Sequence, residues 1–142
     1  VSNTPTGAVS YQVSSANPDL RASLLSGGRT LRLTVQYTPN GSSTPTTGTM
    51  TIRLFESAAP LATGRVVQLA ESGYYNGRLF HRVINDFVIQ GGSSDGFGGA
   101  GSGLPPVPDE FNPAFTFASP GIVAMANAGD DGNDAQFFIT DP

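Results

Sequence analysis

The 142-residue sequence contains no cysteine and no tryptophan, and it has a single histidine, His81. The absence of cysteine excludes disulfides and thiolate chemistry, so any metal site would depend on His81 and carboxylates. Only 13% of the residues are charged, whereas about a quarter is usual. The seven basic residues are scattered and the net charge is −4. Because a nucleic-acid surface needs clustered positive charge, no nucleic-acid partner is expected.

Long apolar runs are also missing, since none reaches the roughly 20 residues of a membrane-spanning helix. No membrane span is therefore expected. The chain begins at Val1 rather than Met, which indicates a processed or excised piece of a longer protein. The lack of Cys and Lys and the abundance of Thr, Ser, Gly and Asn favour an exported bacterial protein. The expected location is accordingly extracytoplasmic: periplasmic, cell-surface or secreted.

Eighteen glycines and 11 prolines favour many short strands over long helices. Apolar and polar residues alternate over 31–37 and again over 50–54, which predicts two half-buried strands. The segment 38–48 between them is rich in Pro, Asn, Gly, Ser and Thr. Together these segments predict an antiparallel hairpin with a long loop.

Residues 1–28 are polar and rich in Ser, Asn and Gly. Val9, Tyr11 and Val13 alternate with polar residues, which predicts one short strand. We interpret the segment as a linker or as the tail of a preceding β-domain, so neighbouring β-domains are expected partners.

One helix is predicted over residues 60–72. Ser57 could cap it, Pro60 would lie in its first turn, and Gly73 stands where it should end. Later apolar runs are too short for helices and are bounded by turn residues. They predict the strands of a closed antiparallel β-barrel, over 79–84, 87–91, 115–117, 121–126 and 136–140.

Two blocks of sequence carry a family resemblance. Residues 77–92 read GRLFHRVINDFVIQGG, and residues 120–139 read PGIVAMANAGDDGNDAQFFI. In order and spacing they resemble the two signatures of the cyclophilins, the peptidyl-prolyl cis–trans isomerases. The resemblance covers roughly residues 29–141 and implies a mainly β, cyclophilin-like closed antiparallel barrel with one clear helix. Residues 29–142 would form this domain.

The resemblance also implies the residues of a site that rotates X–Pro bonds. Arg82 matches the catalytic arginine, whose guanidinium is always charged and donates in a fixed fork. The apolar pocket for the proline ring would be formed by Phe87, Val88 and Phe138. The peptide backbone would be held by polar side chains and a chain edge, namely Gln90, Gln136, Ala126, Asn127 and Ala128. At position 88 the family commonly has Met, so Val88 implies a wider pocket and lower affinity.

Each of these residues also has a plainer interpretation. Arg82 could be a rim arginine, the apolar residues could be ordinary core, and Asn127 could be a turn residue. His81 is usually structural in the family. Gly96–Gly101 matches G-x-G-x-x-G formally, but Pro105 and Pro106 follow where a dinucleotide site needs a helix. The acidic turn 130–134 lacks EF-hand spacing, so no metal and no cofactor are expected.

The resemblance breaks at the C-terminus, because the family continues with two strands and a second helix that close the barrel. The domain is therefore expected to be C-terminally incomplete. The chain could be a fragment, another chain could supply the missing part, or residues 9–14 could substitute for a strand; we favour a fragment.

The expected function is prolyl isomerisation on proline-containing peptides or unfolded proteins, and cyclosporin-like ligands are further expected partners. The alternative is a non-catalytic binding or structural module of an extracellular or cell-surface protein.

Overall fold

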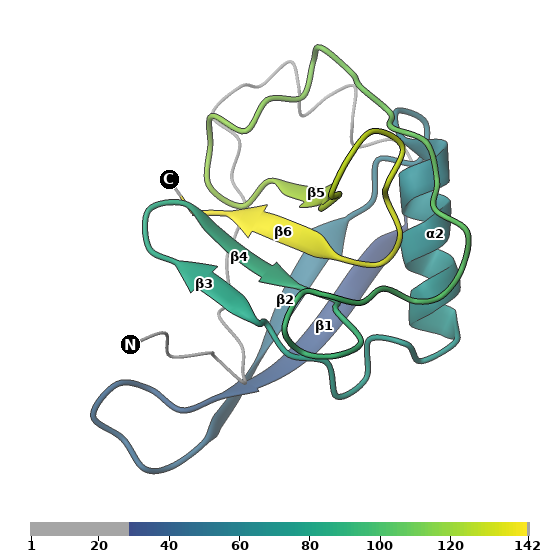
Figure 1. Ribbon diagram of the computed structural model, residues 1–142. Coiled ribbons are helices and arrows are strands. Elements are labelled where there is room, and N and C mark those ends of the chain that lie inside the picture. The colour runs from purple at the N-terminus through teal and green to yellow at the C-terminus, as the bar shows by residue number, and fades with distance from the viewer. Residues whose placement is uncertain (1–28, 142) are drawn as a thin grey trace.

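The computed structural model describes residues 29–141, which form six β-strands and one α-helix (Figure 1). The mainly β prediction with one helix is confirmed. The strand expected at Val9, Tyr11 and Val13, and with it the linker or domain tail over 1–28, lies outside the described residues. Among the described residues, no helix is long and apolar enough to cross a membrane.

Strands β1 (Thr30–Tyr37) and β2 (Thr46–Arg53) form the predicted antiparallel hairpin. Eight residue pairs hold it, from Thr30 opposite Arg53 to Tyr37 opposite Thr46. Inward and outward side chains alternate along β1, as the sequence pattern requires. The hairpin loop extends away from the rest of the domain (Figure 1).

The other strands form one antiparallel sheet in the order β3-β4-β6-β5. Its strands are short, which agrees with the brief apolar runs of the sequence: β3 (Arg82–Ile84), β4 (Val88–Gly91), β5 (Val123–Met125) and β6 (Phe137–Thr140). One row across the sheet places Gln90 opposite both Arg82 and Phe138. The next row places Ile89 opposite Val83 and Ile139. The sheet therefore has one polar and aromatic row next to an aliphatic one.

The aliphatic row belongs to the hydrophobic core. Five buried residues from β2, β4, β6 and the segment before β3 form its centre: Met50, Phe80, Ile89, Phe137 and Ile139. Phe80 and Phe137 meet edge to face with ring centroids 6.0 Å apart. This core joins the hairpin to the four-stranded sheet.

The helix α2 (Pro60–Glu71) begins at the predicted Pro60, but Ser57 does not cap it. The residue before the helix is Ala59, and it makes no side-chain capping bond. Instead the carboxylate of Glu110 accepts the free N–H groups of Leu61 and Ala62 at 3.1 and 2.8 Å. A carboxylate suits the positive end of the helix dipole, so a distant residue performs the capping.

The helix ends at Glu71, and Gly73 follows at the stop position that the sequence predicts. Gly73 has a φ of +74°, a left-handed conformation that glycine adopts without strain. Its N–H donates to Ala70 O at 3.0 Å, and the N–H of Tyr74 donates to Leu69 O at 2.9 Å. This is a Schellman motif, which satisfies the last carbonyl groups of the helix.

The predicted strand over 115–117 is absent from the structure, where these residues form a loop. Two of their side chains nevertheless pack against other aromatic rings. The ring centroids of Phe115 and Phe55 are 4.8 Å apart, and those of Phe117 and Phe138 are 5.4 Å apart. Prolines at 113 and 120 flank the run and cannot donate to a strand ladder. The apolar run thus reflects ring packing rather than strand pairing.

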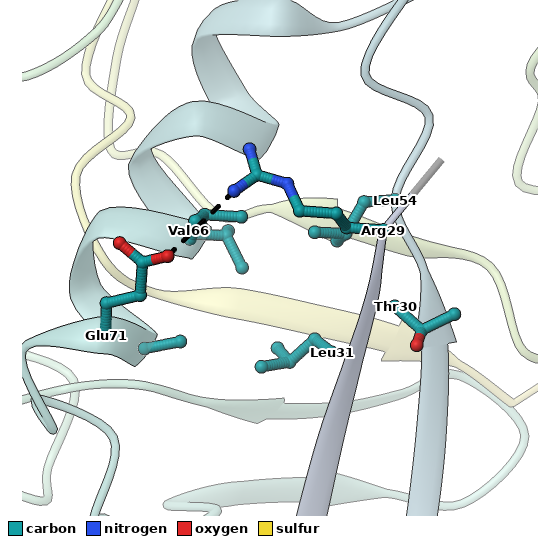
Figure 2. A pocket seen from close by; sticks show the side chains of 8 residues that line it. Arg29, Thr30, Leu31, Leu54, Val66 and Glu71 are labelled. Atoms are coloured by element: carbon teal, nitrogen blue, oxygen red, sulfur yellow. Dashed lines mark ion pairs between the residues drawn. The ribbon is translucent and has the colours of Figure 1, made fainter. Parts of the chain in front are cut away.

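A small hollow of about 160 Å³ lies between α2 and the start of β1 (Figure 2). Its walls are mainly aliphatic, with Leu31, Leu54 and Val66 among them. At its rim the guanidinium of Arg29 pairs with Glu71 at 4.0 Å. Both side chains of this ion pair are mostly exposed, so it adds little stability. No set of polar groups converges on the hollow, so we do not assign it a function.

The two leucines of α2 provide a test of this packing. Leu69 is only 3% exposed, whereas Leu61 is 47% exposed. We expect Leu69→Ala to lower the free energy of unfolding by about 2–5 kcal/mol, because it leaves a cavity. The matched control Leu61→Ala should cost less than about 1 kcal/mol. Urea denaturation followed by circular dichroism measures both, and equal losses would contradict the packing of α2.

Candidate active site

A groove of about 400 Å³ lies over the polar and aromatic row of the four-stranded sheet. Seven of the nine site residues predicted from the sequence line it: Arg82, Phe87, Val88, Gln90, Ala126, Asn127 and Phe138. Gln136 and Ala128 do not line the groove. Four residues that the prediction missed do so: Asp86, Phe117, Met125 and Thr140. These residues come from segments far apart in the sequence, so the fold gathers them in one place.

Arg82 lies at the exposed end of a chain of side-chain hydrogen bonds. Its Nη1 donates to Gln90 Oε1 at 3.2 Å, and Gln90 Nε2 donates to Gln136 Oε1 at 3.1 Å. Gln136 Nε2 then donates to Gly98 O at 3.0 Å. Each amide therefore has a fixed orientation, and Gln136 acts on the groove through Gln90. Within residues 29–141, the bond to Gln90 is the one hydrogen bond of the Arg82 side chain, so its other donors can meet a ligand.

Aromatic rings form the apolar part of the groove. The guanidinium of Arg82 lies 5.6 Å from the ring centroid of Phe87, within cation–π range. Phe87 and Phe117 are 54% and 59% exposed, although aromatic rings are usually buried. Below them Val88 is only 5% exposed and forms part of the floor. An apolar hollow with a few convergent polar groups is typical of ligand sites.

The turn between β3 and β4 aims Phe87 at this hollow. Asp86 has a φ of +56°, a left-handed conformation that Asp tolerates better than most residues. The turn comprises residues 85–87, and the hairpin is closed beyond it by the pair Ile84 and Val88. Asp86 has no strong sequence signal for a site role, which is why the prediction missed it.

The opposite wall is formed by the segment after β5. The N–H of Ala126 donates to Gln136 O at 2.8 Å, which continues the pairing with β6. Asn127 turns its side chain away from this pairing, and its Nδ2 donates to Asp109 Oδ1 at 2.9 Å. Asn127 therefore both begins the turn that follows β5 and lines the groove. The sequence carried a signal for two of the missed groove residues. Met125 lies within the second signature block, residues 120–139, and Phe117 lies three residues before it.

His81 does not line the groove. Its Nδ1 is buried without a hydrogen-bond partner among residues 29–141. Burial lowers the pKa of His81 below its ordinary value of 6.5, and the nearby Arg82 charge acts in the same direction; Asp95 opposes both. The ring packs against Gly98, where φ is +91° and a Cβ would come within 3.0 Å of Nε2. This environment is that of a structural, neutral histidine.

The glycine-rich loop is ordered by a carboxylate rather than by helix formation. Asp95 Oδ1 accepts the N–H groups of Phe97 and Gly98 at 2.8 and 3.1 Å, and the buried Ser93 hydroxyl at 2.5 Å. The Ser93 hydroxyl is the chief cause that holds the pKa of Asp95 below its usual range. The expectation that residues 96–101 form a loop is confirmed. Its position beside Gln136 makes it a support of the polar chain.

Comparison with known proteins identifies the family. The family model described as cyclophilin type peptidyl-prolyl cis-trans isomerase/CLD matches residues 41–142. A crystal structure of a Cryptosporidium parvum cyclophilin type peptidyl-prolyl cis-trans isomerase superposes with a TM-score of 0.62 at 37% identity, covering 66% of this chain and 60% of that one. A second structure of that protein was determined in the presence of the dipeptide Ala-Pro. The chain belongs to the cyclophilin family and has its fold, as the two sequence blocks predicted.

Curated relatives show the same membership. Peptidyl-prolyl cis-trans isomerase-like 1 of Mus musculus is 42% identical over 104 residues, which cover 72% of this chain and 63% of that protein. The spliceosome-associated protein CWC27 homolog of Xenopus laevis is 44% identical over 97 residues, 67% of this chain but 20% of that protein. The chain thus spans about three fifths of the isomerase-like relatives and a fifth of the frog protein.

These relatives contradict the expected extracytoplasmic location in a bacterium. They come from mouse and frog, and a further one from Neurospora crassa, all eukaryotes; the frog protein is named as spliceosome-associated. The composition that suggested export has a different origin. Of the 45 Gly, Ser and Thr residues, 14 lie in two loops, the hairpin loop over 38–45 and the loop over 92–103. The turns in which they lie account for these residues without reference to a compartment.

The neutral state of His81 can be measured directly, because the chain has no other histidine. We expect the NMR titration of its ring to have a midpoint below 6.5. The unfolded chain would then bind the proton more readily than the folded one. Folding stability should therefore fall as the pH drops from about 6.5 through the lower native pKa. A midpoint above 6.5 would contradict the burial of Nδ1.

Proposed function

We propose that the chain is a peptidyl-prolyl cis–trans isomerase that acts on X–Pro bonds of peptides and unfolded proteins without a cofactor. The observation that carries the proposal is the position of the exposed Arg82 guanidinium beside an aromatic hollow in one groove. Family membership supports the same activity, since the family is described by it.

The chemistry requires no bond to break. The X–Pro C–N bond has partial double-bond character, and its rotation barrier is ~18–20 kcal/mol. In the proposed mechanism the proline ring occupies the hollow of Phe87, Val88 and Phe138, so this end of the peptide is held. Arg82 donates a hydrogen bond that favours the pyramidal imide nitrogen of the twisted state. Such an interaction is stronger in the transition state than in the substrate, which is what accelerates a reaction.

The remaining predicted residues would hold the chain while the bond rotates. Gln90, fixed by Gln136, meets the peptide next to Arg82, and the main chain of Ala126, Asn127 and Ala128 pairs with it as an extended strand. Among residues 29–141, no hydrogen bond uses the main-chain atoms of Asn127, so they are free for this role. Cyclosporin-like ligands would compete for the same surface.

Replacing Arg82 tests the catalytic role. We expect Arg82→Ala to lower kcat/KM by about a hundredfold or more, because removal of one positioned donor typically costs that much. The measurement is a protease-coupled assay on a proline-containing tetrapeptide. The control is Arg32→Ala, because Arg32 is also exposed but lies on β1 and does not line the groove. Unchanged turnover in Arg82→Ala, with an intact circular dichroism spectrum, would falsify the role.

A second candidate function is proline-peptide binding without catalysis. It is favoured by the frog relative, in which the matching segment is only a fifth of a larger protein named as spliceosome-associated. The same assay separates the two functions. Binding of a proline peptide by isothermal titration calorimetry, with no turnover by the unmodified chain, would favour the binding module.

A further inference from the structure

The loop over 107–110 connects the turn that follows β5 to the N-terminus of α2. On one side the N–H of Val107 donates to Asn133 O at 2.7 Å. On the other side Glu110 caps the N-terminus of α2. Asp109 lies between these two anchors, and it does not line the groove itself. Its neighbours show what it holds in place.

The carboxylate of Asp109 collects three donors from the turn that follows β5. Its Oδ1 accepts Asn127 Nδ2 at 2.9 Å and Asn133 Nδ2 at 2.7 Å, and its Oδ2 accepts the N–H of Asp131 at 3.3 Å. The contact with Asp131 is reciprocal, since the N–H of Asp109 donates to Asp131 Oδ1 at 2.8 Å. One side chain therefore fixes the first, middle and last parts of the turn over 127–133.

Within the turn the N–H of Gly132 donates to Gly129 O at 3.1 Å, and Asp109 supplies the further bonds to its two ends and its middle. Asp131 has a φ of +55°, which is uncommon for a residue other than glycine. Asn127 is exposed, and its one side-chain hydrogen bond within residues 29–141, to Asp109, is what orients it. By contrast Asn133 is 6% exposed and also donates to Val107 O at 3.2 Å, which makes it a rigid base for the carboxylate. The rigidity of the core thus reaches Asn127 through Asp109.

We propose that Asp109 is a positioning residue for the peptide: it fixes the main chain of Asn127 in the conformation that receives an extended substrate. It therefore sets the affinity for the peptide rather than the rate of bond rotation at Arg82. This inference rests on the proposed function, because it concerns the same groove.

The state of the carboxyl group agrees with this role. The Asn133 amide and then the Asp131 N–H hold the pKa of Asp109 below its usual range; burial opposes them, and the Asn127 amide adds a smaller lowering. The group is thus ionised near neutral pH, and bonds to a charged acceptor are stronger than those to a neutral one. An amide in its place would present an NH₂ group to at least one of the same donors.

The test compares Asp109→Asn with Asp130→Asn. Both remove one negative charge at the same end of the domain, but Asp130 is exposed and forms no hydrogen bond with another residue of 29–141. Kinetics on a proline tetrapeptide should show KM about tenfold higher in Asp109→Asn and kcat within about twofold of the unmodified chain, because loss of a charged hydrogen bond shifts binding by about that much. Asp130→Asn should match the unmodified chain in both constants.

A double-mutant cycle identifies the route of the effect. If Asp109 acts through Asn127, Asp109→Asn should raise KM little further in the Asn127→Ala background. Independent, multiplied effects on KM would overturn the inference, as would an unchanged KM or a loss confined to kcat. If Asp109→Asn does not fold, Asn127→Ala alone tests the inference, because the Asn127 side chain is exposed and its removal should leave the fold intact. An unchanged KM in Asn127→Ala then overturns the inference.

Failure of the proposed function gives a different result. In that case the unmodified chain itself shows neither turnover nor binding of the tetrapeptide by calorimetry. The positioning role of Asp109 is tested when the unmodified chain turns over the peptide, and it then fails on an unchanged KM, on a loss confined to kcat, or on independent effects in the double mutant.

Discussion

The antiparallel register of β3, β4 and β6 is the constraint on which the site depends. Because side chains alternate across a sheet, the row with Ile89 and Ile139 enters the core, while the row with Arg82, Gln90 and Phe138 faces the groove. A shift of one residue would exchange these two rows. The same hydrophobic burial that stabilises the sheet therefore also places the guanidinium beside the aromatic rings.

Polar contacts then hold the side chains and loops of the groove in fixed orientations. The chain from Arg82 through Gln90 and Gln136 to Gly98 O orients each amide, and it ends on a loop that Asp95 orders. On the other wall Asp109 plays the corresponding part for the turn that begins at Asn127. Carboxylates outside the groove thus determine the shape of its edges, because irregular loops have no ladder of backbone bonds to fix them.

Buried charge performs a similar structural role on the helix. Arg65 is 8% exposed, pairs with Asp134 at 3.1 Å, and donates to Pro105 O at 2.6 Å. The Ser102 hydroxyl also donates to Asp134. These bonds tie the loop after the glycine-rich segment to α2, and removing one partner of such a pair would leave an unpaired charge in the interior.

The sequence by itself determined the mainly β class, the hairpin, the helix over most of its length, and the two blocks that carry the family, because alternation and ordered motifs are local signals. It also named seven groove residues. Only the tertiary structure decided that Glu110 rather than Ser57 caps the helix, that Arg65 is buried, that Phe117 joins the groove from a loop, and that Asp109 supports Asn127. Each of these depends on contacts between residues that lie far apart along the chain, and no local pattern encodes such contacts.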